Sequence, residues 1–200
     1  MQKFIGKAIA AASLLATAFA ASPAAANGAA MLTTGSTSQP VGHYEFCKTY
    51  GDTCQRSDGV GVVRLSESSW SKLVAVNSAV NSSIIARTDI EMHGVPEVWS
   101  YPTYQGDCED FVLLKQYMLA REGIPASALL ITVVRQTNGE GHAVLTVRTD
   151  RGDFILDNLD DRVLAWSDTD YQFLKRQSER HAGKWVGIAD DRNILVGSVR

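Results

Sequence analysis

Helical spacing of apolar residues precedes strand-like alternation in this chain of 200 residues. In residues 66–94, apolar side chains recur at intervals of three and four, and residues 107–123 repeat that spacing. From residue 129 onward, short β-branched runs follow one another and are separated by turn residues. Two helices followed by an antiparallel sheet predict an α+β fold.

Local signals set the expected bounds of these elements. The first helix is expected to start within the serine-rich residues 66–69 and to end within residues 90–94. Asp107 suits the cap of the second helix and Gly123 its end. The other elements are expected, in chain order, as a short strand at 60–65, strands at 129–135, 143–148 and 154–156, a helix at 170–180 and an edge strand at 184–188.

The first 26 residues have the pattern of a secretory signal. Lys3 and Lys7 give a positive start, residues 8–21 are apolar and alanine-rich, and residues 24–26 are small enough for a signal peptidase. The apolar stretch is too short to serve well as a membrane anchor. We therefore expect cleavage after Ala26 and a periplasmic or secreted mature chain that does not span a membrane.

The mature chain is expected to form a single domain, because about 174 residues remain after cleavage. Residues 27–65 are expected to be an N-terminal leader and loop, and residues 66–200 the main domain. The net charge is −3, with charges of both signs interleaved and no basic stripe. This pattern disfavours nucleic acid as a partner.

Three cysteines, Cys47, Cys54 and Cys108, make an odd count for an oxidising compartment. A disulfide between Cys47 and Cys54 closes a short turn-rich loop and contributes about 2–3 kcal/mol by the chain-entropy argument. Two alternatives stay open, because sequence does not set connectivity: all three thiols reduced, or Cys108 paired with one of the others. With the local disulfide, Cys108 is the free thiol.

Cys108 falls in the expected first turn of the second helix, where the helix dipole favours a reactive thiolate. The neighbouring acids Asp107, Glu109 and Asp110 oppose this, because negative charge disfavours a thiolate. A functional thiol here therefore requires a counterweight. His142 as an imidazolium is one candidate, and a cation bound to the carboxylates is another.

His142 and Asp157 lie on successive expected strands, His142 at the start of one and Asp157 at the end of the next. Antiparallel pairing of these strands can bring Asp157 to one ring nitrogen of His142 and leave the other for Cys108. An oxyanion hole can come from the Cys108 backbone N–H and a side chain of residues 99–105. The residues thus predict a nucleophile, a base and a group that orients the base.

The remaining histidines give weaker signals. His43, His93 and His181 lie in loop-like contexts, and we expect them at the surface. No cysteine and histidine have the ligand spacing of a zinc site, which disfavours zinc.

Three motifs together resemble the bacterial transglutaminase-like cysteine proteinases, whose best-known members are the LapG-type periplasmic proteases. The motifs are Gly106-Asp107-Cys108-Glu109-Asp110-Phe111, Gly141-His142-Ala143-Val144-Leu145 and Phe154-Ile155-Leu156-Asp157-Asn158. The resemblance covers roughly residues 66–166. It implies a papain-like or transglutaminase-like core with Cys108 as nucleophile, His142 as general base and Asp157 as its orienting group.

The resemblance also implies a cofactor and partners. The acids beside the nucleophile of LapG-type proteins help to bind calcium, and here they correspond to Asp107 and Glu109. A calcium ion would offset the charge conflict around Cys108. The implied substrate is a protein, such as a large surface adhesin whose cleavage releases cells from a surface. An inner-membrane regulatory receptor is a further implied partner.

Three functional hypotheses remain at this point. The leading one is a periplasmic cysteine endopeptidase that uses a Cys-His-Asp triad. The second keeps the triad but makes the protein a transglutaminase or a cell-wall peptide amidase. The third is a catalytically inactive periplasmic binding or scaffold protein.

Overall fold

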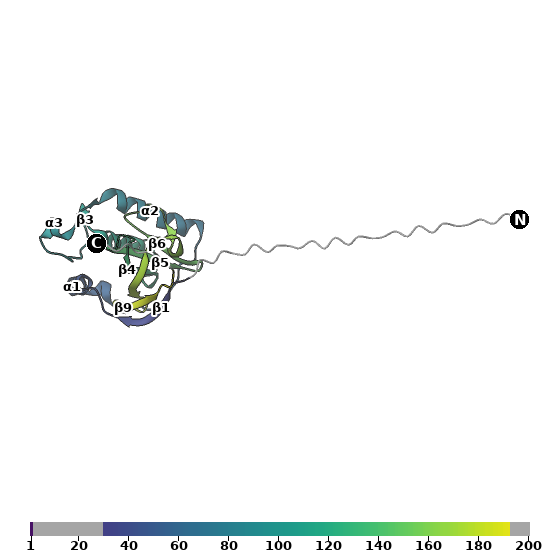
Figure 1. The fold of residues 1–200 in the computed structure, drawn as a ribbon, viewed down its shortest axis with the longest axis horizontal. Helices are drawn as coiled ribbons and strands as arrows, with labels where there is room; N and C mark the ends of the chain where they lie inside the picture. The colour runs from purple at the N-terminus through teal and green to yellow at the C-terminus, as the bar shows by residue number, and fades with distance from the viewer. Residues whose placement is uncertain (2–29, 193–200) are drawn as a thin grey trace.

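The computed structural model describes residue 1 and residues 30–192. A seven-stranded sheet with every neighbouring pair antiparallel forms its centre (Figure 1). In spatial order the strands are β1 (Leu32–Thr37), β9 (His181–Ala189), β8 (Gln172–Ser178), β4 (Leu129–Arg135), β5 (Gly141–Thr149), β6 (Gly152–Leu156) and β7 (Leu164–Ala165). Together with the helices, this sheet confirms the α+β prediction.

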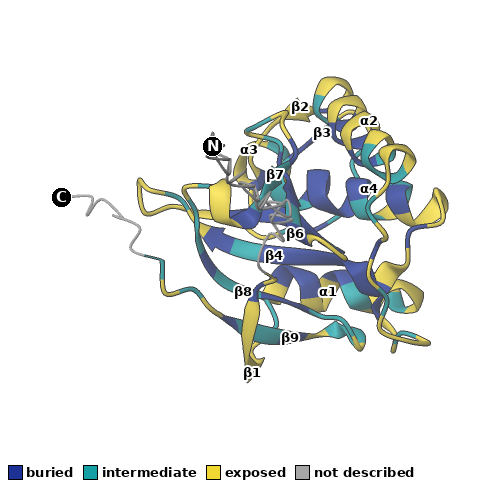
Figure 2. Ribbon diagram, turned by 90° about the vertical axis from the view of Figure 1, so that its right-hand side faces the viewer, coloured by how far each residue is buried: buried dark blue, intermediate teal, exposed yellow. Residues whose placement is uncertain are grey.

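Two helices form layers over the sheet. The inner helix α4 (Cys108–Arg121) packs on β4 and β5, and α2 (Glu67–Ser83) packs on α4 farther from the sheet (Figure 2). The other regular elements are α1 (Val41–Thr49), α3 (Asp89–His93) and a short parallel pair, β2 (Ile85–Ala86) and β3 (Gln105–Gly106). Helix α4 is therefore packed between the sheet and α2, and this packing holds its N-terminus in place.

Alternating residues of β5 supply both hydrophobic cores. Ala143 and Leu145 belong to the larger core, which includes Phe111 and Leu113 of α4. Val144 belongs to a smaller core that also contains Trp166 and Phe173. Because side chains alternate across a strand, this pattern requires β5 to be buried on both faces.

The first long helix is shorter than the sequence pattern predicts. Helix α2 starts after Ser66, which forms a capping box with Ser69, but it ends at Ser83 rather than within residues 90–94. The Ile85 backbone N–H donates to the Tyr104 carbonyl at 2.9 Å, so the chain enters the β2–β3 pair instead. Thr88 and Glu91 form a second capping box that starts α3.

The expected leader and loop contain regular structure, so that prediction was wrong. Residues 32–37 form β1, which pairs with β9 and makes β9 an interior strand rather than an edge. Residues 41–49 form α1 without a side-chain cap. The side chains of β1 are exposed, so its formation depends on backbone pairing with β9 and leaves no apolar pattern in the sequence.

Two further expectations need correction. Residues 170–180 contain the strand β8 rather than a helix, because β8 bonds to both β4 and β9 inside the sheet. The expected strand at 60–65 is reduced to a single bridge between Val63 and Thr149. The strands expected at 129–135, 143–148 and 154–156 are confirmed as β4, β5 and β6.

The expected signal, residues 1–26, lies outside the described residues except for residue 1. Within the part of the chain that the structure describes, no helix has both the length and the apolar character needed to cross a bilayer.

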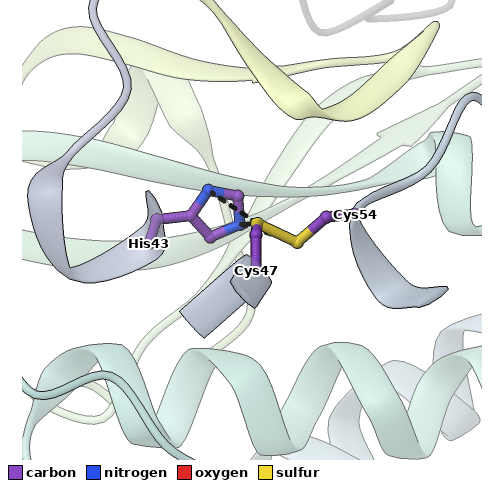
Figure 3. A group of neighbouring side chains, drawn as sticks. All are labelled: His43, Cys47 and Cys54. Atoms are coloured by element: carbon purple, nitrogen blue, oxygen red, sulfur yellow. Dashed lines mark hydrogen bonds between the residues drawn. A yellow bond between two sulfur atoms is a disulfide. The ribbon is translucent and has the colours of Figure 1, made fainter. Parts of the chain in front are cut away.

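The Cys47–Cys54 disulfide is present (Figure 3). Among the described residues, Cys108 is the free cysteine. His43 lies beside the disulfide with 1% of its surface exposed, so the expectation of a surface histidine was wrong. Helix α1 turns the ring inward, where the Trp185 Nε1–H donates to Nδ1 at 3.1 Å. Burial lowers the pKa of His43 to about 4 and keeps it neutral. His93 is exposed as expected, whereas His181 is half-buried at the start of β9.

Replacing both disulfide cysteines, C47S with C54S, should lower the free energy of unfolding by about 2–3 kcal/mol, because the unfolded chain regains loop entropy. Urea unfolding measures this change. C108S is the matched control, since it removes a thiol without opening a cross-link. Equal unfolding free energies for C47S/C54S and C108S would contradict the prediction.

Candidate active site

Cys108 is the first residue of α4, and Asp107 occupies the N-cap position. Asp107 has extended backbone geometry, but its side chain makes no capping hydrogen bond. Gly106 allows close approach here, because a Cβ at this position would lie 2.7 Å from the Asp110 Cβ. The turn into α4 thus brings the Cys108 thiol close to the carboxylates of Asp107 and Glu109.

The Cys108 thiol is held in its protonated form. Burial raises its pKa well above the usual value, and the Glu109 carboxylate adds to the effect by accepting a hydrogen bond from Sγ at 2.8 Å. The backbone N–H of Ala143 donates to the sulfur and acts in the opposite direction. This contact places the thiol beside the residue that follows His142.

His142 and Asp157 form a buried pair. The Nε2 atom of His142 lies 2.8 Å from Oδ1 of Asp157, and the two side chains are 3% and 4% exposed. Nδ1 is therefore the ring nitrogen left for another partner. The strands that carry the two residues, β5 and β6, pair antiparallel with Leu145 opposite Leu156, as the sequence predicted.

Asp157 is held as a carboxylate by three donors. Burial raises its pKa, but hydrogen bonds from His142, Tyr171 and Leu159 outweigh burial and leave the pKa below its usual value. The Tyr171 hydroxyl donates to Oδ2 at 2.5 Å and the Leu159 backbone N–H to Oδ1 at 3.0 Å. Tyr171 also lies with its ring centroid 5.5 Å from that of His142. It was missed because residues 170–180 were expected to form a helix.

The structure brings the three expected residues to one end of α4 and β5 but does not join all of them. Within residues 30–192, the hydrogen bonds of the Cys108 sulfur lead to Glu109 and Ala143, not to His142. Catalytic hydrogen bonds are often long before a substrate binds. The pairing of Cys108 with His142 therefore stays a prediction.

A second group of side chains suits a metal ion. Carboxylate oxygens of Asp89, Asp107 and Asp110 lie within 4.8 Å of one another. Asp110 accepts from the Ser100 N–H at 2.8 Å and Asp89 from the Val98 N–H at 2.5 Å. One oxygen each of Asp89 and Asp107 is buried without a hydrogen-bond partner. Oxygen-only donors with unpaired buried atoms fit a hard divalent cation.

The pKa values of Asp107 and Asp110 in this acidic cluster also favour a bound cation. Burial, with repulsion from Glu109 and Asp89, raises the pKa of Asp107 to about 9. Burial also raises the pKa of Asp110 to about 6, although hydrogen bonds from Ser100 oppose it. A bound cation would remove the cost of ionising these groups.

The predicted metal ligands Asp107 and Glu109 have different surroundings. Asp107 lies in the cluster, whereas the Glu109 carboxylate accepts the hydrogen bond from Cys108. Asp89 was missed because it belongs to α3, far from Cys108 in the sequence, and no local pattern marks it as a ligand. His43, Cys47 and Cys54 also lie close together, but the disulfide engages both sulfur atoms.

Comparison with known proteins identifies the class. Residues 33–193 match the family model of the bacterial transglutaminase-like cysteine proteinase BTLCP. The chain belongs to this family, which is a family of cysteine proteases. A comparison with curated protein sequences gave no match.

Two solved structures of Legionella pneumophila LapG share the fold. One is 25% identical and is matched over 77% of this chain and 83% of its own, with a TM-score of 0.51. EGTA-treated LapG is 24% identical over 78% and 82%, with a TM-score of 0.50. Calcium-bound LapG is 28% identical over 54% of this chain and 64% of its own, with a TM-score of 0.48.

When a chelator removes metal ions, the acidic cluster should lower the free energy of unfolding as pH rises from about 4 towards 9. The reason is that aspartates in the unfolded chain titrate at ~3.9. The folded state binds more protons than the unfolded state in this window, because the pKa values of Asp110 and Asp107 are raised to about 6 and about 9. D107N should therefore gain stability over the wild type as pH increases. Urea unfolding at several pH values measures this, with the exposed Asp52→Asn as the control. A pH-independent difference between D107N and the wild type would contradict it.

Proposed function

We propose that this protein is a periplasmic cysteine endopeptidase that cleaves a protein substrate with Cys108, His142 and Asp157. The buried His142–Asp157 pair carries the proposal, because it fixes the ring orientation and engages Nε2. The free thiol at the start of α4, next to Ala143, supplies the nucleophile. Membership in a family of cysteine proteinases supports this reading.

The reaction starts with transfer of the Cys108 proton to Nδ1 of His142. The thiolate attacks the scissile carbonyl carbon, and the resulting imidazolium gives its proton to the leaving amine. The thioester that remains is hydrolysed by a water from which His142 takes a proton. Asp157 stabilises the imidazolium at both stages, and Tyr171 keeps that carboxylate charged.

The oxyanion needs donors near the thiol. The Cys108 backbone N–H lies at the start of α4, where helix N–H groups are free to bind an anion. Gln105 in β3 is the side chain of residues 99–105 nearest in sequence to Cys108, and we assign it the second donor role.

Calcium is the proposed cofactor, with Asp89, Asp107 and Asp110 as its ligands. The ion would supply positive charge that offsets the carboxylates around the nucleophile. Glu109 would then be drawn less strongly to the thiol proton, which favours the thiolate. Structures of LapG in calcium-bound and EGTA-treated forms support the choice of calcium.

The substrate class follows the family resemblance. We propose a large surface adhesin as the substrate and an inner-membrane receptor as a regulatory partner. Transfer of the acyl group to an amine, as in a transglutaminase, or cleavage of cell-wall peptides would use the same three residues. A catalytically inactive binding or scaffold protein is the non-enzymatic alternative.

C108A and H142A should each reduce cleavage of surface proteins by about a thousandfold or more, because each removes a group that takes part in bond breaking. New N-termini in a surface-protein fraction, counted by mass spectrometry, measure the loss. Circular dichroism confirms that both variants fold, and Asp52→Asn, which changes an exposed side chain outside the site, is the control. Full cleavage by either active-site variant would overturn the proposal.

Two further assays separate the alternatives. Incorporation of a labelled amine into a glutamine-rich protein would identify a transglutaminase, and release of peptides from cell-wall fragments an amidase. A slow reaction of Cys108 with iodoacetamide, unchanged in H142A, would favour the scaffold protein.

Calcium should raise the melting temperature, and D89N and D110N should each reduce this shift, because each loses a charged ligand. Binding at 100 times Kd stabilises the folded state by about 2.7 kcal/mol. Magnesium and the Asp52→Asn variant are the controls. The calcium assignment fails if all variants respond as the wild type does.

A further inference from the structure

Lys115 is a fully buried lysine in α4, with 0% of its surface exposed. Its Nζ atom has no hydrogen-bond partner among the described residues. Lysine is almost never fully buried without a partner, because removing an ammonium group from water costs several kcal/mol. An apolar side chain would fill the same space at lower cost, so packing does not explain the lysine.

The ammonium group lies on the active-site side of its own residue. Helical side chains point back towards the helix N-terminus, here towards Cys108, two turns away. The Nζ atom lies 5.9 Å from the ring centroid of Phe111, one turn closer to Cys108. Asp157 and Asp161 are the charged groups whose attraction raises the pKa of Lys115. The ammonium is thus within electrostatic reach of the carboxylate that orients His142.

Helix α2 contacts the same loop from the other side. Asn77 donates to the Asp161 carbonyl at 3.0 Å, and Asn81 donates to the Asp157 carbonyl at 2.8 Å. The amide oxygens of both asparagines are buried and unpaired. Two unpaired acceptors and one unpaired donor therefore come from the helices, α2 and α4, that pack against each other. Residues 157–161, which we call the Asp157 loop, are thus hydrogen-bonded to α2 and carry the two carboxylates that attract Lys115 of α4.

We propose that Lys115 is a positioning residue for the Cys-His-Asp site. Its ammonium balances the buried charge of Asp157, in the loop that Asn77 and Asn81 of α2 hold through its backbone carbonyls. Lys115 takes no part in bond breaking. This inference rests on the proposed function, because it assigns Lys115 a role through Asp157.

The surrounding charges agree with this role. Burial lowers the pKa of Lys115 to about 7, and Asp157 and Asp161 act against burial. On the sheet side, His142 and Tyr171 are both hydrogen-bonded to the Asp157 carboxylate. On α2, Lys72 bonds to Glu122 beyond the far end of α4.

The test compares K115M, which removes the charge, with K115R, which keeps it, and with the matched control K72M, a more exposed lysine. Iodoacetamide alkylation of Cys108 is followed from pH 5 to 9 by mass spectrometry, with saturating calcium throughout. K115M should shift the pH–rate profile upwards by about half a unit or more, a loss of about threefold or more at pH 7. K115R and K72M should stay close to the wild type.

Thermal unfolding checks that K115M is folded during the assay. K115M should melt at a lower temperature than the wild type at pH 7, because the buried carboxylate of Asp157 loses its balancing charge, and K115R should restore the melting temperature. A profile that is shifted in folded K115M and restored by K115R supports the inference. A K115M profile that coincides with that of the wild type overturns it, as does a K115R profile shifted as far as that of K115M.

H142A in the same assay tests the proposed function separately. If H142A leaves the alkylation profile unchanged, His142 is not the base and the proposed function fails. If H142A changes the profile while K115M does not, the proposed function stands and only the role of Lys115 is lost.

Discussion

The packing of α4 on β5 is the contact on which the rest of the site depends. It buries Phe111 and Leu113 against Ala143 and Leu145, and it brings the Cys108 sulfur to the Ala143 N–H. The larger core makes this contact rigid, since closely packed side chains leave little room for α4 to slide. The residues that start α4 and β5 therefore meet at one end of a solid core, where small shifts would separate the proposed nucleophile and base.

Charge is unevenly distributed around this contact. At the N-terminus of α4, Asp89, Asp107 and Asp110 gather negative charge, and burial together with this repulsion raises the pKa values of Asp107 and Asp110. Two turns along, the ammonium of Lys115 is buried within reach of Asp157. Helix α4 thus places carboxylates beside the Cys108 thiol and the Lys115 ammonium near Asp157, the residue that orients His142. Under the proposed function, calcium balances the first group and Lys115 the charge of Asp157.

The sequence identified residues whose signals are local. Cys108 stands at a helix start, and His142 and Asp157 stand at strand ends, so the antiparallel pairing of β5 with β6 could be expected. Asp89 and Tyr171 could not be found in this way. The first lies on a five-residue helix, and the second comes directly before the interior strand β8, in a segment that the sequence pattern misassigned as a helix. His43 was misplaced for a similar reason, because α1 has no cap signal.

By itself, the sequence determined the α+β class, the Cys47–Cys54 pairing as the favoured disulfide and the three residues proposed for catalysis, because periodicity, spacing and caps are properties of neighbouring residues. Only the tertiary structure decided that β1 closes the sheet beside β9, that Asp89 joins Asp107 and Asp110, and that Lys115 is buried near Asp157. These contacts join segments far apart in the chain. Their energies come from backbone pairing, burial and charge between elements, and none of these leaves a local pattern in the sequence.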